Sequence, residues 1–207
     1  MPETGLKVDD LSLARGGHEV LSRIGFTLGP GSLLELRGPN GAGKSSLLLA
    51  LAGLISVDQG TIAWSGHDEE TPHRTLIHFL GHHAAIKPGL SVAENLGFWV
   101  DVLEGDRSQI DPALDAAGLA SIKRLDAGVL SAGQGRRLAL ARLLAVKRPV
   151  WLLDEPTSAL DDNGALWVGE LIADHVAQGG IAVIATHLDI DYRGAIVPQR
   201  MQLGSGA

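Results

Sequence analysis

The chain has 207 residues, of which 45% are hydrophobic and 27 are glycine, and its formal net charge at pH 7 is −7. This length and composition fit one globular domain with a large buried core, and they exclude a disordered chain. The acidic balance argues against a broad nucleic-acid surface. The lack of cysteine excludes disulfides and thiolate metal sites, and it is compatible with a reducing compartment.

The first third of the chain predicts strands with one helix among them. Apolar residues in 6–13 and 20–28, separated by Arg15-Gly16-Gly17, predict an antiparallel hairpin. The apolar run 33–36 predicts a buried strand, and residues 45–52 are strong helix formers. We expect further strands at 61–64 and 76–80, with a solvated loop at 68–73 between them.

A glycine-rich loop joins the strand at 33–36 to the helix, with the spacing G-x-x-x-x-G-K-S of a phosphate-binding loop. Its glycines let successive backbone N–H groups point at phosphates from a helix N-terminus. Lys44 should bridge the β- and γ-phosphates of ATP, and the Ser45 hydroxyl should bind Mg²⁺. A chance match in an ordinary turn is the alternative, which the flanking strand and helix disfavour. The nucleotide-binding residues predicted here are Gly38, Pro39, Asn40, Gly41, Ala42, Gly43, Lys44, Ser45 and Ser46.

Residues 84–128 favour helices. Ser91 and Glu94 have the spacing of a capping box, which predicts a helix to about residue 103. Asp111-Pro112 predicts the start of a second helix that ends before Gly118. We interpret the chain as one domain, 1–207, with a core of 1–83 and 129–207 and an inserted helical subdomain at about 84–128.

The last third alternates helices with apolar strands. A helix is expected at 136–146, with Arg136, Arg137 and Arg142 facing outward. Strands at 150–153 and 181–185 flank a helix at 162–177. This alternation predicts an α/β fold with a mostly parallel sheet, whose ligand sites lie at the carboxyl ends of the strands.

Three polar residues follow these strands. Asp154 is placed to hold Mg²⁺ and Glu155 to act on an attacking water, two tasks that ATP hydrolysis requires. An acidic pair after a strand is by itself more often a cap or turn, and the phosphate loop upstream favours the functional interpretation. His187 could contact the γ-phosphate or the attacking water, or be an ordinary histidine at a strand end.

Five motifs in this order resemble the nucleotide-binding domain of ATP-binding-cassette transporters: the phosphate loop, 130–134 (Leu-Ser-Ala-Gly-Gln), 151–155, 158–161 and 186–187. The resemblance implies the P-loop NTPase fold of that family, with ATP and Mg²⁺ as cofactors. It also implies a head-to-tail homodimer, in which the signature residues Ser131, Gly133 and Gln134 of one copy cover the nucleotide on Lys44 of the other. Glu155 would be the general base, His187 a switch, and Asp161 would communicate across the dimer.

Two positions depart from the family pattern. Arg15 stands near the place of an aromatic residue that stacks on adenine, and a guanidinium can also stack on a ring, although Arg15 could equally be a solvated turn residue. His82 replaces a glutamine that senses Mg²⁺ and water, and its charge depends on pH. A metal or haem site at His78, His82 and His83 is the alternative, disfavoured against a loop histidine pair that holds no metal.

Further loop residues, among them Gly81-His82, 86–88, 94–99 and 130–137, resemble one branch of the family: the haem-exporter ATPase subunits of bacterial cytochrome c maturation. That branch implies an ATPase bound to integral membrane subunits on the cytoplasmic face of the inner membrane. No signal peptide or membrane-spanning run is expected from the sequence. The alternatives are a soluble ATPase, such as one of iron–sulfur assembly, and a regulatory module that binds ATP without hydrolysing it.

Overall fold

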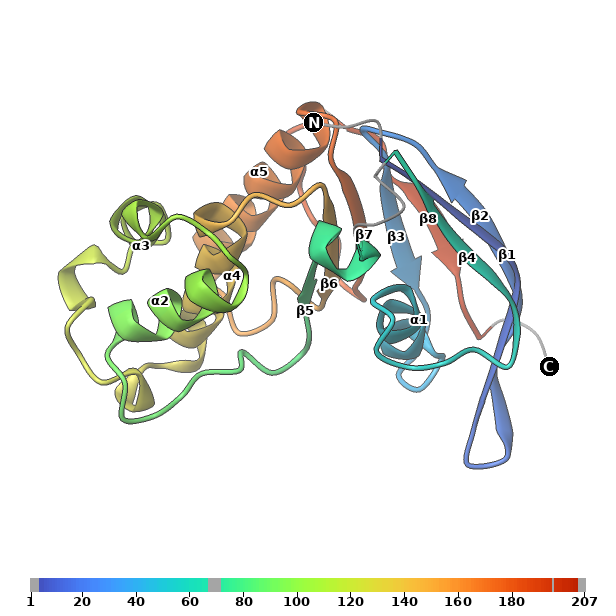
Figure 1. The fold of residues 1–207 in the computed structure, drawn as a ribbon, viewed down its shortest axis with the longest axis horizontal. Helices are drawn as coiled ribbons and strands as arrows, with labels where there is room; N and C mark the ends of the chain where they lie inside the picture. Colours follow the sequence, from blue (N-terminus) through green and yellow to red (C-terminus); the bar gives the residue numbers. More distant parts are fainter. Residues whose placement is uncertain (1–3, 67–71, 195, 205–207) are drawn as a thin grey trace.

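The computed structural model describes residues 4–66, 72–194 and 196–204, and Figure 1 shows their arrangement. The strands are β1 (Gly5–Arg15), β2 (His18–Leu28), β3 (Leu33–Arg37), β4 (Gln59–Ser65), β5 (Ile77–Leu80), β6 (Val150–Asp154), β7 (Ile181–Ala185) and β8 (Gln199–Gln202). The helices are α1 (Lys44–Leu51), α2 (Val92–Val102), α3 (Ile110–Ala116), α4 (Ala132–Ala145) and α5 (Asp162–Ala177).

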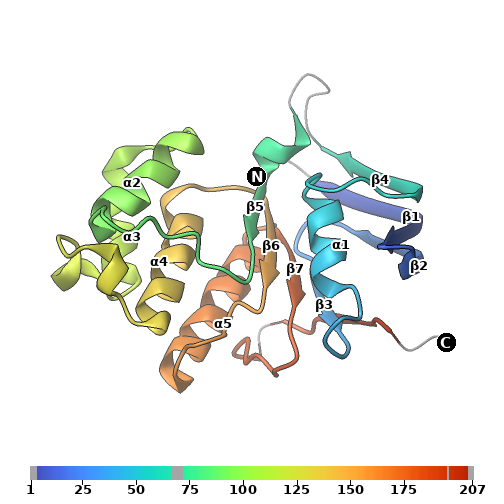
Figure 2. The ribbon, with the colours of Figure 1, turned by 90° about the horizontal axis from the view of Figure 1, so that it is seen from below.

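The central sheet has five strands in the order β5-β6-β7-β3-β8, and every described pairing in it is parallel. Side chains alternate between its two faces, as the pleat of a strand requires. In β7, Val183 packs on the face that α1 covers, whereas Ala182 and Ile184 pack with α4 and α5. Figure 2 shows α1 between the two sheets and α4 and α5 on the opposite face. Both faces are therefore covered, which explains the continuous apolar runs.

A second, antiparallel sheet has the order β2-β1-β4. The predicted hairpin is confirmed, because β1 pairs antiparallel with β2 from Leu6↔Leu28 to Arg15↔His18. The strand expected at 61–64 is present as β4 and pairs with β1. The inner faces of both sheets close over α1 in one apolar core that includes Leu11, Leu36 and Leu48. The mostly parallel sheet with an antiparallel strand pair is thus confirmed.

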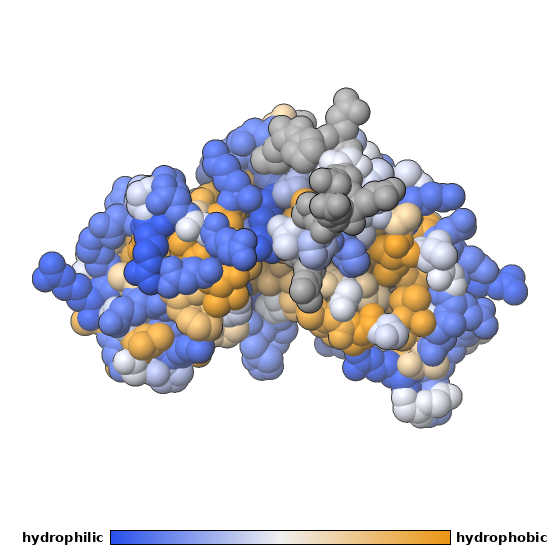
Figure 3. Space-filling view, viewed as in Figure 1, coloured by the Kyte–Doolittle hydropathy of each residue, from blue (hydrophilic) through white to orange (hydrophobic). Residues whose placement is uncertain are grey.

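The helices α2 and α3 pack against α4 around a separate apolar cluster that includes Leu96, Leu114 and Leu138. Ser91 caps α2 with the predicted capping box, because its Oγ accepts from Glu94 N and the Glu94 carboxylate accepts from Ser91 N. Figure 3 shows hydrophilic residues along the outer rim of this helical lobe and apolar residues nearer the sheets. No described helix combines the length and apolarity needed to cross a bilayer.

The structure differs from the sequence-based expectations in three places. Helix α4 begins at Ala132, so the signature residues form its first turn. The outward orientation predicted for Arg136 and Arg142 is wrong, because both side chains are buried. Arg136 donates to backbone carbonyls at the ends of β5 and β6, and Arg142 lies over the Trp99 ring of α2. Strand β8 was not predicted, since its sequence, Gln-Arg-Met-Gln, is mostly polar. Most of the loop expected at 68–73 lies outside the described residues.

His78 lies inside the fold on β5. Its Nε2 is 2.6 Å from the carbonyl oxygen of Val146, to which the neutral ring donates. Burial lowers the pKa of His78 to about 3, and burial likewise lowers the pKa of His175, stacked on Trp151, to about 4. His78 is therefore a core residue, and no group of three or more described His, Asp or Glu side chains is arranged to hold a metal ion.

These two histidines predict a loss of stability in acid. In the unfolded chain both histidines bind a proton near pH 6.5. In the folded chain His78 stays neutral down to about pH 3 and His175 down to about pH 4. The free energy of unfolding should therefore decrease as pH falls from about 6.5, and His78 should account for about 2 kcal/mol of the change between pH 7 and pH 5. Urea unfolding of wild type and His78→Gln at both pH values measures this difference. An equal pH dependence in the two proteins would contradict the assignment.

Candidate nucleotide-binding site

The phosphate loop connects β3 to α1 at the carboxyl end of the parallel sheet, and glycine is required within it. Gly43 has φ 92° and is the N-cap of α1, and a Cβ there would lie 2.7 Å from Leu21 Cδ2. Among the described residues no side chain caps α1. The N–H groups of its first turn therefore point from a helix N-terminus into the loop, an arrangement that binds anions.

Lys44 is 7% exposed, and its ammonium lies over the loop. Its Nζ donates to the carbonyl oxygens of Gly38, at 2.7 Å, and Pro39, at 3.0 Å. These bonds hold the positive charge beside the N-terminus of α1, where phosphate oxygens would be attracted by both.

Ser45 and Asp154 bring hydroxyl and carboxylate oxygens together beside the loop. The Ser45 Oγ donates to Asp154 Oδ2 at 2.7 Å, although the two residues are 109 positions apart in the sequence. Mg²⁺ prefers such hard oxygen ligands together with phosphate oxygens and water. The donor set therefore fits the magnesium ion that the sequence predicts at Ser45 and Asp154.

Glu155 follows Asp154 and faces His187. Its Oε1 lies 2.9 Å from His187 Nδ1, and its Oε2 is buried without a hydrogen-bond partner among the described residues. The Glu155 side chain is only 13% exposed, whereas that of His187 is 60% exposed. One carboxylate oxygen is thus oriented by the histidine, and the other has no hydrogen-bond partner among the described residues.

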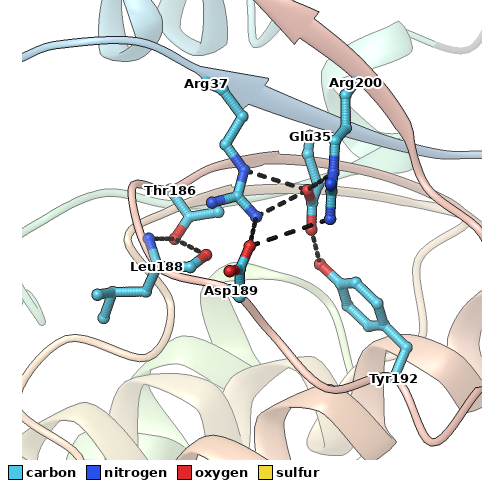
Figure 4. A network of polar contacts seen from close by, with 7 residues as sticks. All are labelled: Glu35, Arg37, Thr186, Leu188, Asp189, Tyr192 and Arg200. Carbon is cyan, nitrogen blue, oxygen red and sulfur yellow. Dashed lines mark hydrogen bonds and ion pairs between the residues drawn. The ribbon is translucent and has the colours of Figure 1, made fainter.

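The segment after His187 is tied to β3 and β8 by the polar network of Figure 4. Glu35, a fully buried carboxylate on β3, accepts from Tyr192 Oη at 2.7 Å, from Arg37 and from Arg200. Arg37 also donates to Asp189 at 3.1 Å. Burial and the neighbouring Glu35 raise the pKa of Tyr192, so its hydroxyl stays a donor. These bonds hold Asp189 and Tyr192, which follow His187 in the chain, against β3.

A cleft of about 450 Å³ contains most of the phosphate loop, both predicted metal ligands and three of the four predicted catalytic residues. His82 contributes from the loop after β5, and Ser158, which the sequence reasoning did not single out as a site residue by itself, contributes from the segment after β6. The sequence signal for Ser158 is its place at the start of the 158–161 motif, which enters the sequence analysis only as part of the family resemblance. The residues that line the cleft are Asn40, Gly41, Gly43, Lys44, Ser45, Ser46, His82, Asp154, Glu155, Ser158 and His187.

The signature residues do not join this cleft. Ser131 is the N-cap of α4 and forms a capping box with Gln134, since its Oγ accepts from Gln134 N and Gln134 Oε1 accepts from Ser131 N. A Cβ on Gly133 would lie 2.9 Å from the carbonyl oxygen of Ala159, so this close approach requires glycine. Ser131 lines a different hollow, on the side of His83 and Ala159.

Five other predicted site residues also lie outside the cleft lining: Arg15, Asp161 and, from the phosphate loop, Gly38, Pro39 and Ala42. Arg15 is exposed at the tip of the β1–β2 hairpin, which projects from the body of the molecule in Figure 1. Asp161 is the N-cap of α5, where its Oδ1 accepts from Gly164 N at 2.8 Å. The structure therefore gives Asp161 a helix-capping contact and gives Arg15 no described contact with the phosphate loop.

Residues 21–158 match the protein family described as "ABC transporter". A protein of Rhodopseudomonas palustris (strain BisB5) named "Cytochrome c biogenesis ATP-binding export protein CcmA" is 48% identical over 95% of this chain and 96% of its own length. Proteins with the same name from Nitrobacter winogradskyi and Bradyrhizobium diazoefficiens are 46% and 50% identical, over 98% and 86% of this chain and 99% and 90% of their own lengths.

Solved structures agree with the fold. A putative ABC transporter ATP-binding protein from Pyrococcus furiosus superposes with a TM-score of 0.81 at 26% identity, covering 96% of this chain and 97% of its own. A bacterial Atm1-family ABC exporter with ATP bound has a TM-score of 0.80 at 22% identity, covering 97% of this chain and 37% of the exporter chain. The chain therefore belongs to the ABC transporter family, as one of its ATP-binding, ATP-hydrolysing domains.

Proposed function

We propose that this chain is the ATP-hydrolysing subunit of an export complex for cytochrome c biogenesis, and that its hydrolysis drives haem export or the release of a haem chaperone. The identity to proteins with that name over nearly the whole chain supports an export ATPase over an iron–sulfur assembly ATPase. The observation that carries the hydrolytic part is the cleft in which Lys44, Asp154 and Glu155 meet. A regulatory module without turnover would not need the Glu155–His187 pair.

In this proposal the phosphate loop binds the triphosphate of ATP. The N–H groups at the start of α1 and the Lys44 ammonium face the phosphates, and Ser45 and Asp154 hold Mg²⁺. The bound ion neutralises charge on the β- and γ-phosphate oxygens. Lys44 exchanges its bonds to the Gly38 and Pro39 carbonyls for phosphate oxygens, which are stronger, charged acceptors.

Glu155 accepts the proton of the attacking water through Oε2, the oxygen that has no hydrogen-bond partner among the described residues. His187 holds Oε1 and thereby fixes the direction in which Oε2 points. His82, which lines the same cleft, is proposed to contact a water or a phosphate there. Asp161 communicates across the dimer, and Arg15 reaches the adenine only if the hairpin tip approaches the cleft.

Two copies form the working unit. Ser131, Gly133 and Gln134 stand at the N-terminus of α4, and none of them lines the cleft beside the phosphate loop of their own chain. A head-to-tail partner would bring these N–H groups to the γ-phosphate, where a helix N-terminus stabilises negative charge. Each dimer then contains two composite sites, and integral membrane subunits bind it at the cytoplasmic face of the inner membrane.

We also propose that the helical subdomain at about 84–128 and the core of 1–83 and 129–207 act as separate parts of a single domain. The separate apolar cluster around Leu96 and Leu114 supports this division. Leu138, on α4, belongs to the same cluster, so α4 joins the two parts.

Glu155→Gln should keep ATP binding and lower kcat by roughly 10² or more, because the amide cannot accept the proton. ATPase rates and nucleotide titrations of the purified protein measure both effects. Glu170→Gln is the matched control, since Glu170 lies on α5 in a surface ion pair with Arg193. Unchanged turnover in Glu155→Gln would remove Glu155 from the mechanism.

A mixing experiment tests the composite site. Lys44→Ala removes the ammonium group of the phosphate loop, and Ser131→Arg places a bulky side chain among the signature residues that would cover the partner's nucleotide. Each variant alone should therefore be inactive. Random mixed dimers contain one intact site, and equal mixing should recover about one quarter of wild-type activity if the two sites act independently. Mixing Lys44→Ala with the double variant Lys44→Ala/Ser131→Arg leaves no intact site and serves as the control. Failure to recover activity above that control would contradict the dimeric site.

Co-purification from bacterial membranes tests the partner. Mild detergent extraction of the tagged chain should recover multi-span membrane proteins of the cytochrome c maturation system, identified by mass spectrometry. Recovery with scaffold proteins of iron–sulfur assembly in their place would contradict the proposed function.

A further inference from the structure

Arg136 is a buried arginine on the second turn of α4, directly behind the proposed general base. It is only 3% exposed. Its guanidinium donates to four backbone carbonyl oxygens: those of Gly81 at 2.9 Å, Asp154 at 2.5 Å, Glu155 at 2.6 Å and Pro156 at 3.2 Å. One side chain thus joins the signature helix, the end of β5 and the end of β6.

These carbonyls explain why a charge is buried here. Past the end of a parallel sheet, carbonyl groups lose their ladder partners and must find other donors. The rigid, planar guanidinium offers five N–H groups, which no other side chain does. Burial lowers the pKa of Arg136, while Asp154 and Glu155 act in the opposite direction. The arginine therefore remains the charged donor that four carbonyls require.

The same contacts act on the backbone of Glu155. Glu155 has φ 48°, in the left-handed region that a residue with a Cβ rarely adopts. Its own carbonyl and those of its two neighbours, Asp154 and Pro156, all accept from Arg136. Because the peptides on both sides are fixed, the Glu155 side chain is directed to His187 and into the cleft.

We propose that Arg136 is the positioning residue of the catalytic carboxylate, and that it links α4 to Glu155 of the same chain. Arg136 does not line the cleft itself, so it acts on hydrolysis only through the backbone of 154–156 and through Gly81, the neighbour of His82. The inference rests on the proposed function, because it presumes that Glu155 is the general base. It adds Arg136 to the residues that act in hydrolysis, although the sequence predicted that this side chain would be exposed to solvent.

Arg142 provides a matched control on the same helix. It is also buried, at 7% exposure, and its Nε donates to the Ala139 carbonyl while its guanidinium stacks over Trp99. Arg142→Gln thus removes a buried arginine from α4 without touching residues 154–156. Loss of stability alone would affect Arg136 and Arg142 variants alike.

The experiment compares steady-state ATPase kinetics of Arg136→Gln, Arg136→Lys and Arg142→Gln with wild type, at a temperature where urea titration shows each protein folded. Arg136→Gln should lower kcat roughly 10- to 100-fold with KM for ATP nearly unchanged, since a displacement of about 1 Å in a catalytic group can cost that much. Arg136→Lys, whose ammonium cannot reach all four carbonyls, should show an intermediate loss and carries the test alone if the glutamine variant does not fold. Arg142→Gln should keep kcat within about twofold.

The double variant Arg136→Gln/Glu155→Gln decides whether the arginine acts through Glu155. Residues that act as a unit are non-additive, so the double variant should be nearly as active as Glu155→Gln alone. Wild-type kcat in both folded Arg136 variants, an equal loss in Arg142→Gln, or fully additive losses would overturn the inference. Wild-type turnover in Glu155→Gln would instead show that the proposed general base is wrong, and the two failures are therefore distinguishable.

Discussion

The parallel ladder β6-β7-β3 determines where the phosphate loop, the Asp154-Glu155 pair and His187 lie. Ala185 pairs with Asp154 on one side and with Leu36 on the other, so these three strands end level with one another. The phosphate loop, the acidic pair and His187 each leave the sheet at that edge. A shift of register in any one strand would remove its group from the cleft. Burial of both faces of the sheet fixes the register, and it therefore also fixes the positions of these side chains.

The sequence predicted the parts of the fold that depend on local pattern. The strands at 150–153 and 181–185 and the helix at 162–177 stand within a residue of their predicted bounds, because apolar runs and helix-capping residues are local signals. The meeting of Lys44, Asp154, Glu155 and His187 in one cleft was also predictable, since parallel strands place their carboxyl ends together. The catalytic roles assigned to these residues remain predictions.

What the sequence could not reveal depends on distant partners. Arg136 and Arg142 look like surface residues on a helix, and only the carbonyls at the ends of β5 and β6 make a buried position for Arg136 favourable. Strand β8 is polar and was missed, yet it completes the sheet beside β3 and brings Arg200 to the buried Glu35. In both cases a buried charge has hydrogen-bond partners on distant elements: carbonyl oxygens accept from Arg136, and Arg200 donates to Glu35. No periodicity in the sequence indicates such a pairing.

Helix α4 has Ser131 as its N-cap and Arg136 on its second turn. In the proposed dimer, one rigid element would therefore contact both the partner's nucleotide and the backbone of Glu155, the proposed general base of its own chain. In a dimer of identical chains, every inherited change in this helix enters both halves of the assembly together. Evolution can therefore adjust the two hydrolytic events only in concert. An asymmetric pair, with one active and one silent site, would first need a duplicated gene whose two products had diverged.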